Sequence, residues 1–314
     1  MSEPLILAIP SKGRLKEQVE AWLADCGLPL QPAGGARGYL AELRGAPGVQ
    51  VRLLSASDIA AAVTGGEAHL GVTGEDLLGE QAQVDQALPL IPLGFGRADL
   101  VVAAPQSWLD VDTMADLAEV SHDILLRTGR RMRVATKYVV QTRAFFAAHE
   151  VDFRIVVSGG ATEGAPAAGV AELIVDIATT GATLIANGLK RLDDGLIVRS
   201  QAWLSASLSA AWTPEQRDRA EHLLRIVEAR ARAKSTARLS WPAEHDDLAA
   251  GVADRLGVAP EQRLEQAFLL DAGQTASAGL ALAAAGAGPV SASRPMMIFD
   301  PASEAAGRLN RALK

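Results

Sequence analysis

One stretch of the sequence has the residue types needed to hold a phosphorylated sugar. An apolar run over residues 172–177 predicts a buried strand, and a turn rich in threonine and glycine follows it before a helix begins. Successive main-chain amides in such a turn form an anion site, to which hydroxyl groups add donors. The residues of this candidate site are Asp176, Thr179, Thr180, Gly181, Ala182 and Thr183.

Asp176 and Gly181 have separate roles in this interpretation. Asp176 stands at the end of the predicted strand, where its carboxylate can accept hydrogen bonds from ribose hydroxyls and favour positive charge developing at the sugar carbon. Gly181 lacks a Cβ, so the backbone can approach a ligand closely. The alternative is an ordinary strand followed by a threonine N-cap and a helix.

Two cations near the N-terminus are also placed to meet a phosphate. Lys12 and Arg14 follow an apolar strand and precede a predicted helix. Arg14 can bind a phosphate through two parallel hydrogen bonds, and Lys12 can act as a point charge. A solvated surface turn is the alternative interpretation.

Positive charge is concentrated in one further segment of this acidic chain, whose net charge is −7. Five cations fall within residues 127–137: Arg127, Arg130, Arg131, Arg133 and Lys137. This local charge suits polyanionic ligands, and Arg133 and Lys137 are the candidates for contact with them. The alternative is an edge strand whose charges oppose aggregation.

Composition limits the class of protein. The 314 residues imply two or three domains, and 49% apolar with only 4% aromatic residues favours α/β architecture. The negative charge argues against nucleic acid as the main partner. The N-terminus has no basic segment typical of a signal peptide, and no apolar run approaches the ~20 residues that cross a bilayer, so we expect a cytoplasmic protein without a membrane partner. Cys26 is the single cysteine, which excludes an intramolecular disulfide, and the histidines lack metal-ligand spacing.

The elements that must position these residues alternate between strand and helix, which predicts mostly parallel sheets covered by helices. Strands are expected at residues 5–9, 49–55, 70–73, 100–104, 133–135, 153–157 and 172–176, and helices at 15–26, 58–63, 138–149 and 214–234. Two blocks of this kind predict a two-lobed core similar to that of periplasmic binding proteins, with a cleft between the lobes.

The expected domains follow from where the chain crosses between the blocks, near residues 95–102 and again near 185–195. Catalytic lobe I takes residues 1–98 and 188–235, and lobe II takes residues 99–187 with the phosphate loop.

After the polar helix the composition changes, and residues 236–314 are expected to form a small separate α/β module. Strands are predicted at 237–241, 266–270 and 296–299, and the Ala-, Gly- and Ser-rich segment 272–295 is expected to be partly a flexible loop.

The run from Gly159 to Leu189 resembles the signature of the ATP phosphoribosyltransferase family. It is long and ordered: Gly-Gly-Ala-Thr-Glu-Gly-Ala-Pro precedes the strand, and Ala-Asn-Gly-Leu follows the loop. Segments 8–15, 70–78 and 134–138 resemble further motifs of the family in the same order, and the resemblance covers about residues 4–212. The single acidic residue before the turn differs from the adjacent acidic pair usual in purine and pyrimidine salvage enzymes.

The resemblance implies a reaction and a set of roles. ATP and 5-phosphoribosyl 1-pyrophosphate (PRPP) give N1-phosphoribosyl-ATP and pyrophosphate, the first step of L-histidine biosynthesis, with Mg²⁺ held through pyrophosphate rather than by protein ligands. The phosphate loop and Asp176 are then expected to bind PRPP, with Asp176, Lys12 and Arg14 as catalytic residues. The residues expected to contact ATP or pyrophosphate are Lys12, Arg14, Gly74, Arg133, Lys137 and Glu163.

The family also implies regulation and assembly. Its longer members carry a ferredoxin-like C-terminal domain that binds L-histidine, so L-histidine is expected to act as a feedback inhibitor here. A homo-oligomer is also expected, with a hexamer as its form. Ser55 stands where the family commonly has an arginine three positions before an Asp-Ile pair, so one ligand contact is expected to differ.

Three other interpretations fit parts of the sequence: a two-lobed solute-binding protein without catalysis, a phosphoribosyltransferase for another base, and an inactive regulatory relative. The missing export signal argues against a solute-binding protein, and the single acidic residue argues against a transferase for another base. The intact loop at residues 176–184 argues against an inactive relative.

Overall fold

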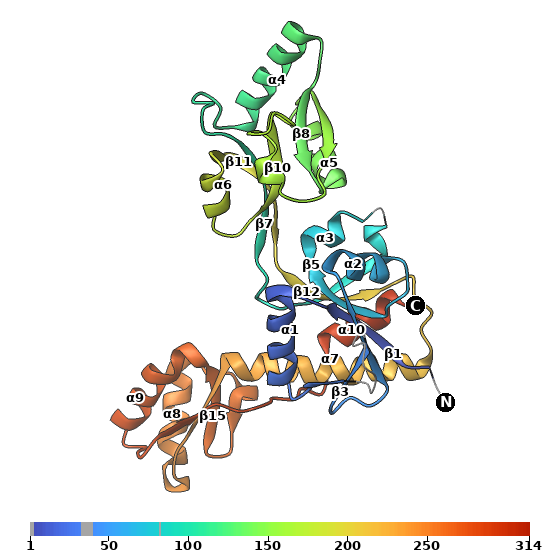
Figure 1. Ribbon diagram of the computed structural model, residues 1–314. Helices are drawn as coiled ribbons and strands as arrows, with labels where there is room; N and C mark the ends of the chain where they lie inside the picture. The colour runs from blue at the N-terminus through green and yellow to red at the C-terminus, as the bar shows by residue number, and fades with distance from the viewer. Residues whose placement is uncertain (1–2, 33–39, 82) are drawn as a thin grey trace.

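The chain folds into three bodies, which Figure 1 shows as an upper lobe II, a central lobe I and a C-terminal module at the lower left. The computed structural model describes residues 3–32, 40–81 and 83–314. The parts of the expected lobe I that lie outside the described residues are 1–2, 33–39 and 82. The two-lobed α/β core with an additional small module is confirmed.

Lobe I is built on a seven-stranded sheet with the order β2-β3-β4-β1-β5-β12-β6. Its strands are β1 (Leu5–Pro10), β2 (Leu30–Pro32), β3 (Leu40–Leu43), β4 (Val49–Leu54), β5 (Leu70–Gly74), β6 (Ala87–Pro92) and β12 (Ala202–Ser207). Its helices are α1 (Gly13–Asp25), α2 (Ala56–Thr64), α3 (Glu75–Gly79), α7 (Pro214–Ser235) and α10 (Glu304–Ala312).

The central strand β1 shows why this sheet is covered on both faces. Leu5 and Leu7 point into the core beneath α1, α7 and α10, whereas Ala8 packs with α2 on the other face. The sequence of a strand that is buried on both faces is typically a continuous apolar run, as it is at residues 5–9. Gly71 of β5 is required by this packing, because a Cβ there would lie 2.5 Å from a methyl group of Val63.

Lobe II contains a five-stranded sheet with the order β11-β7-β10-β8-β9. Its strands are β7 (Ala98–Pro105), β8 (Met132–Thr136), β9 (Phe153–Val157), β10 (Leu173–Ala178) and β11 (Leu189–Ser200), and its helices are α4 (Met114–Thr128), α5 (Val139–Ala148) and α6 (Ala182–Ala186). Residues of β7 alternate between a core shared with α4 and α5 and a smaller core shared with α6.

The sheets are mixed, which corrects the expectation that they are mostly parallel. β4, β1 and β5 are parallel, as are β10, β8 and β9, but the other pairings in the two lobes are antiparallel. In lobe II the reason is the connection between lobes: β7 carries the chain out of lobe I and β11 brings it back alongside, so the two strands run in opposite directions.

The lobe boundaries also differ from those expected. β11 pairs with β7 as far as Ser200, so lobe II extends to residue 200 rather than 187. The chain end returns to lobe I, where Ala305, Ala306 and Leu309 of α10 join its core, so the C-terminal module does not reach residue 314. Figure 1 shows α10 beside α7 in the body of lobe I.

The C-terminal module has the strand order β14-β15-β13-β16, and every neighbouring pair is antiparallel. Its elements are β13 (Thr236–Ser240), α8 (Asp246–Leu256), β14 (Arg263–Leu264), β15 (Ala267–Asp271), α9 (Thr275–Ala284) and β16 (Ser291–Ser293). This βαββαβ sequence with the fourth strand beside the first is the ferredoxin-like arrangement, which the sequence raised as a possibility.

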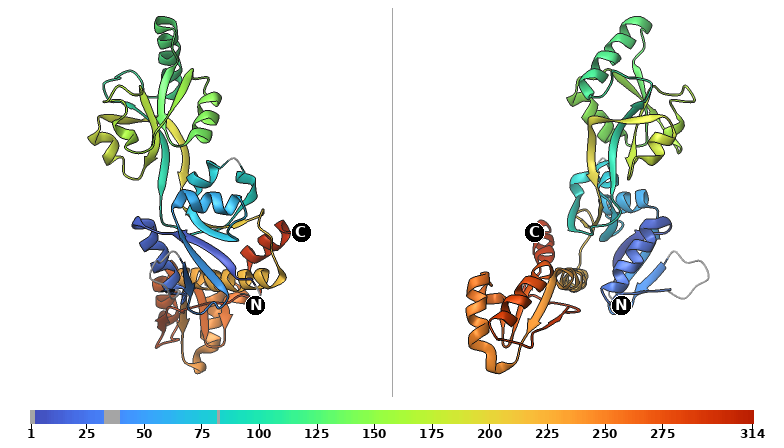
Figure 2. Two further views of the ribbon diagram at one scale, coloured as in Figure 1. Left: turned by 45° about the vertical axis from the view of Figure 1, so that its right-hand side comes forward. Right: turned by 90° about the vertical axis from the view of Figure 1, so that its left-hand side faces the viewer.

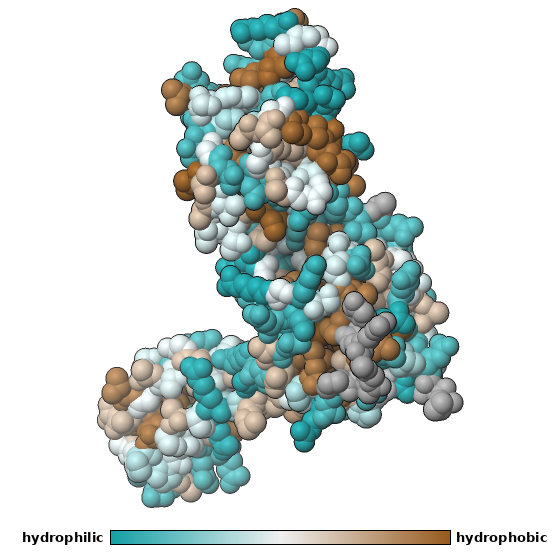
Figure 3. Space-filling view, viewed as in Figure 1, coloured by the Kyte–Doolittle hydropathy of each residue, from teal (hydrophilic) through white to brown (hydrophobic). Residues whose placement is uncertain are grey.

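Two details of the module were predicted wrongly. Residues 296–299 are not a strand, and the short β16 pairs with β13 instead. The segment 272–295 is largely ordered, because α9 buries Ala278 and Leu282 against the module's own core. Figures 2 and 3 show the module as a separate mass beside lobe I, on the side away from lobe II.

Within the described ranges, none of the helices combines the length and apolar character required to cross a membrane.

Candidate active site between the lobes

The threonine- and glycine-rich turn lies between β10 and α6, as the sequence predicts. Thr179 and Thr180 are exposed, and the Ala182 amide donates to the Thr180 hydroxyl over 3.4 Å. Across the described part of the chain, the amides of Thr180 and Gly181 have no hydrogen-bond acceptor. Unpaired amides in an exposed turn are what an anion site requires.

Gly181 is needed for its backbone conformation rather than for space. Its φ is +75°, in the left-handed region that residues with a Cβ rarely adopt. A Cβ at this position would meet no atom within 4 Å, so close approach of the surrounding protein is not the reason for a glycine.

Asp176 lies at the end of β10 in a half-buried position. One carboxylate oxygen accepts the Ile177 amide at 2.8 Å. Burial raises the pKa of Asp176 above its ordinary value, the nearby Lys137 opposes this shift, and Glu163 adds to it. The structure therefore brings together three residues that the sequence selected from separate segments.

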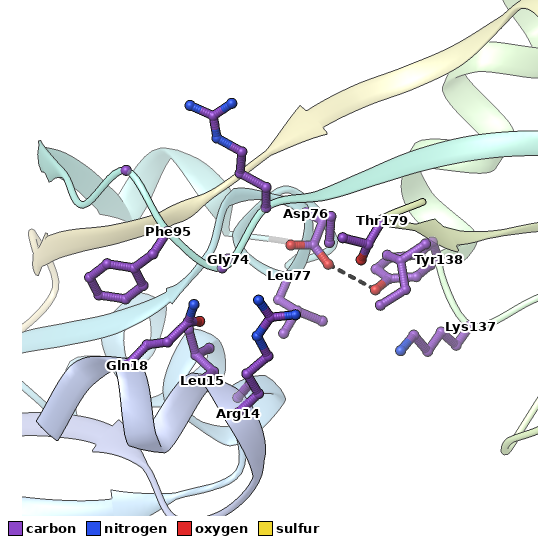
Figure 4. Close-up of a pocket in the computed structure, with 16 residues that line it drawn as sticks. Arg14, Leu15, Gln18, Gly74, Asp76, Leu77, Phe95, Lys137, Tyr138 and Thr179 are labelled. Atoms are coloured by element: carbon purple, nitrogen blue, oxygen red, sulfur yellow. Dashed lines mark hydrogen bonds between the residues drawn. The ribbon is translucent and has the colours of Figure 1, made fainter. Parts of the chain in front are cut away.

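A cavity of about 600 Å³ lies between the lobes. Four of the predicted residues line it: Arg14 and Gly74 from lobe I, and Lys137 and Thr179 from lobe II. Figure 4 shows the Arg14 and Lys137 side chains directed into this space from opposite lobes. In the described ranges neither cation has a carboxylate within 4.0 Å, so both charges are available to a ligand.

Lys12 and Glu163 lie outside the lining of this cavity. Lys12 is the exposed N-cap residue of α1, two positions from Arg14. Glu163 belongs to the single turn at Thr162–Gly164, which packs beside β10. Arg14 itself lines the cavity. Glu163 lies near Asp176, which precedes the lining residues Ile177 and Thr179 but is outside the lining itself, as are residues 180–183.

Arg133 is not brought to the cavity. Its guanidinium binds the Glu172 carboxylate at 2.6 and 3.0 Å, near the opposite ends of β8 and β10 from the phosphate turn. Burial alone would raise the pKa of Glu172, but the Arg133 guanidinium and amide lower it overall. Arg127 and Arg131 form ion pairs with Asp123 and Asp152, so Lys137 is the member of this cluster that lines the cavity.

A buried polar network at the junction of the lobes was not predicted from the sequence. Asp76, at the start of α3, is 5% exposed. Its carboxylate accepts the Tyr138 hydroxyl at 2.8 Å and the Ser200 hydroxyl at 2.6 Å, and its carbonyl accepts the Gln141 amide group at 2.7 Å. Figure 4 shows the Tyr138–Asp76 hydrogen bond across the cavity wall. Burial, followed by the charge of Asp76, raises the pKa of Tyr138 far above its ordinary range, so the hydroxyl stays protonated.

The segment Gly94–Phe95–Gly96–Arg97, which enters β7, also lines the cavity and was not singled out. Gly96 has φ +64°, and a Cβ there would approach a Leu15 methyl group to 2.9 Å. Two glycines flanking an aromatic residue directly before the chain crosses between the lobes were the available signal.

Ser55, where an arginine was expected, caps α2. Its hydroxyl accepts the Asp58 amide at 3.2 Å and contacts the Asp58 carboxylate at 2.6 Å. The short side chain serves this helix end, and the following Ala56 lines the cavity.

Across the ranges that the structure describes, no group of three or more His, Cys, Asp or Glu side chains is arranged to hold a metal ion.

Taken with the fold, these features define a two-lobed α/β protein with a cation-bearing cavity between its lobes. The ATP phosphoribosyltransferase (HisG) family model matches residues 55–229. An ATP phosphoribosyltransferase of Caulobacter vibrioides is 60% identical over 317 residues, covering 100% of this chain and 99% of its relative. The chain belongs to the ATP phosphoribosyltransferase family.

Other relatives agree with this assignment. An ATP phosphoribosyltransferase of Bradyrhizobium diazoefficiens is 59% identical over 236 residues, 74% of this chain and 73% of the relative. Among solved structures, the ATP phosphoribosyl transferase (HisG:HisZ) complex from Thermotoga maritima matches with a TM-score of 0.55 at 24% identity, over 71% of this chain and 96% of that one. That likeness supports the fold.

Proposed function

We propose that the interlobe cavity is where this chain transfers the phosphoribosyl group of PRPP to N1 of the ATP adenine, releasing pyrophosphate in the first step of L-histidine biosynthesis. The family supplies the reaction. One observation carries the location: the phosphate turn contributes Thr179 to a cavity that also receives Arg14 and Lys137 from opposite lobes.

PRPP binding is assigned to lobe II. The unpaired amides of Thr180 and Gly181, with the neighbouring hydroxyls up to Thr183, receive the 5-phosphate. Asp176 accepts hydrogen bonds from the ribose hydroxyls, and Glu163 supports it from the adjoining turn. Gly181 holds the turn in a left-handed conformation with φ +75°.

Transfer then depends mainly on alignment and charge. The adenine N1 forms a bond to ribose C1 as the bond from C1 to pyrophosphate breaks, and positive charge develops on the sugar. Asp176 stabilises that charge, while Lys12, Arg14 and Lys137 neutralise the departing pyrophosphate. Gly74 lines the cavity, and a Cβ at this position would collide with the Asp76 carboxylate, so the glycine leaves room for that side chain beside the nucleotide.

Mg²⁺ fits this site through the substrates. Asp76 is the carboxylate in the cavity lining, and it already accepts two hydroxyl groups, so it is poorly available as a magnesium ligand. Magnesium usually takes phosphate oxygens and water with few carboxylates, and when bound it would supply further neutralisation of the pyrophosphate.

The C-terminal module is assigned to regulation by L-histidine. Its ferredoxin-like topology and its separation from the catalytic lobes support this role. We also infer a cytoplasmic enzyme that assembles as a homo-oligomer, with a hexamer as the expected form.

The decisive experiment is an assay with ATP and PRPP, with and without L-histidine. Formation of N1-phosphoribosyl-ATP and pyrophosphate is expected, and Thr180→Ala should raise the PRPP KM about tenfold through loss of one charge-assisted hydrogen bond. Free purine and pyrimidine bases serve as control acceptors. Turnover with a free base but not with ATP would overturn the assignment, and a rate unaffected by histidine would remove the regulatory role alone.

A further inference from the structure

A second hollow, of about 400 Å³, adjoins the interlobe cavity, and three of its seven lining residues are arginines. It shares Arg97, Ala98 and Thr179 with the large cavity. Arg191 and Arg199 complete its positive wall from β11, the strand that returns the chain to lobe I. The two spaces therefore meet at these shared residues.

The charges in this hollow are largely uncompensated. Arg97 and Arg199 are exposed, and among the described residues neither has a carboxylate within 4.0 Å. Arg191 lies 3.8 Å from Asp99, the single acidic residue of the lining. The hollow therefore has three cations and one anion in a chain whose net charge is −7. Such a local excess of positive charge is unfavourable for folding and suits an anionic ligand.

The chemistry of the lining favours several phosphates over a single carboxylate. A guanidinium presents paired N–H donors that match two oxygens of a phosphate. Three such groups around one hollow can meet successive phosphates of a chain. Asp99 uses only part of the donor capacity of Arg191.

We propose that this hollow, defined by Arg97, Arg191 and Arg199, is a subsite for an oligophosphate chain of a substrate bound in the interlobe cavity. The chain is either the triphosphate of ATP or the pyrophosphate of PRPP, and the subsite rests on the proposed transferase function. Arg97 contributes to both spaces, so it connects the subsite to the reacting groups.

The test combines kinetics with direct binding for Arg97→Gln, Arg199→Gln and the double variant. Each single change should weaken binding of the phosphate chain about tenfold. Calorimetric titration with inorganic tripolyphosphate and with pyrophosphate measures binding to the subsite in the absence of turnover. A raised ATP KM with weaker tripolyphosphate binding assigns the triphosphate, and a raised PRPP KM with weaker pyrophosphate binding assigns the pyrophosphate.

Arg154→Gln is the matched control, because it removes an exposed arginine from β9 at the far edge of the lobe II sheet. Arg199→Lys keeps the charge but loses the paired donors, so it should recover part of the affinity. The proposal would be overturned if the Arg97 and Arg199 variants had KM values and phosphate-chain affinities within twofold of those of the Arg154 variant. A change confined to kcat would overturn it as well. Absence of wild-type turnover would instead reject the transferase function and leave the titrations to judge the hollow.

Discussion

Two carboxylates border the proposed chemistry, and their surroundings give them different roles. Asp76 is buried and accepts the hydroxyls of Tyr138 and Ser200, so it holds structure together. Asp176 accepts the amide of the next residue, and burial raises its pKa. A half-buried carboxylate at the end of a strand, facing a cation such as Lys137, is placed to interact with a ligand.

The raised pKa of Asp176 predicts opposite effects on stability and activity. Because the folded pKa exceeds the unfolded one, the stabilisation belongs to the protonated carboxyl and is lost as pH rises through the folded value. Ionised Asp176 therefore costs stability at neutral pH, and Asp176→Asn should raise the melting temperature while lowering kcat/KM for PRPP about 10²-fold. Thermal denaturation and steady-state kinetics measure the two effects.

The pH profile provides the control for this residue. Wild-type activity should fall on the acid side at a pH above the ordinary aspartate pKa, because the carboxylate is lost there. This limb should be absent from the residual activity of Asp176→Asn. An unchanged limb would show that another group controls it.

At the scale of the element, the short helix α6 is framed by two glycines in the left-handed region. Gly181 precedes it with φ +75° and Gly188 follows it with φ +67°. A Cβ on either would meet no atom within 4 Å. Both glycines share the same backbone requirement, but phosphate binding is proposed for Gly181 alone. Comparing variants of the two therefore distinguishes the backbone effect from loss of phosphate binding.

Gly181→Ala and Gly188→Ala should each cost about 1–2 kcal/mol of stability, the penalty for a Cβ in the left-handed region. Only Gly181→Ala should also raise the PRPP KM, by about tenfold or more, because its amide belongs to the phosphate turn. Chemical denaturation and PRPP kinetics on both variants check this. Equal KM values would place the phosphate elsewhere.

At the scale of the molecule, the lobes are joined by more than the two strands between them. The Asp76–Tyr138 hydrogen bond crosses from α3 to the start of α5, and Glu80 accepts the Val140 amide at 2.7 Å at the same helix N-terminus. A carboxylate is favourable at that end of a helix. These contacts hold one relative placement of the lobes, and hence one shape of the cavity.

Tyr138→Phe should weaken this placement. Removing a buried hydroxyl that donates to a carboxylate costs about 1.5–3 kcal/mol, so the melting temperature should fall. A double-mutant cycle with Asp76→Asn isolates the pair, and a coupling energy near zero would show that the bond does not join the lobes. The KM values for both substrates should rise together, because both lobes form the cavity in which transfer is proposed to occur.

Local patterns of residues specify most of the elements and the phosphate turn. Residues 172–184 encode both a buried strand and a turn, through apolar residues followed by threonines and a left-handed glycine, and such local signals survive into the fold. The capping box of Thr213 and Gln216 likewise marks the start of α7 where it was predicted.

Which of these residues meet depends on long-range packing. Arg133 and Lys137 are four positions apart, yet one is bound to Glu172 and the other lines the cavity, because they lie at opposite ends of one strand. Asp76, Tyr138 and Ser200 form one network although up to 124 residues separate them. Pairings of this kind depend on strand register and on how two lobes pack, and no local pattern of residues records either.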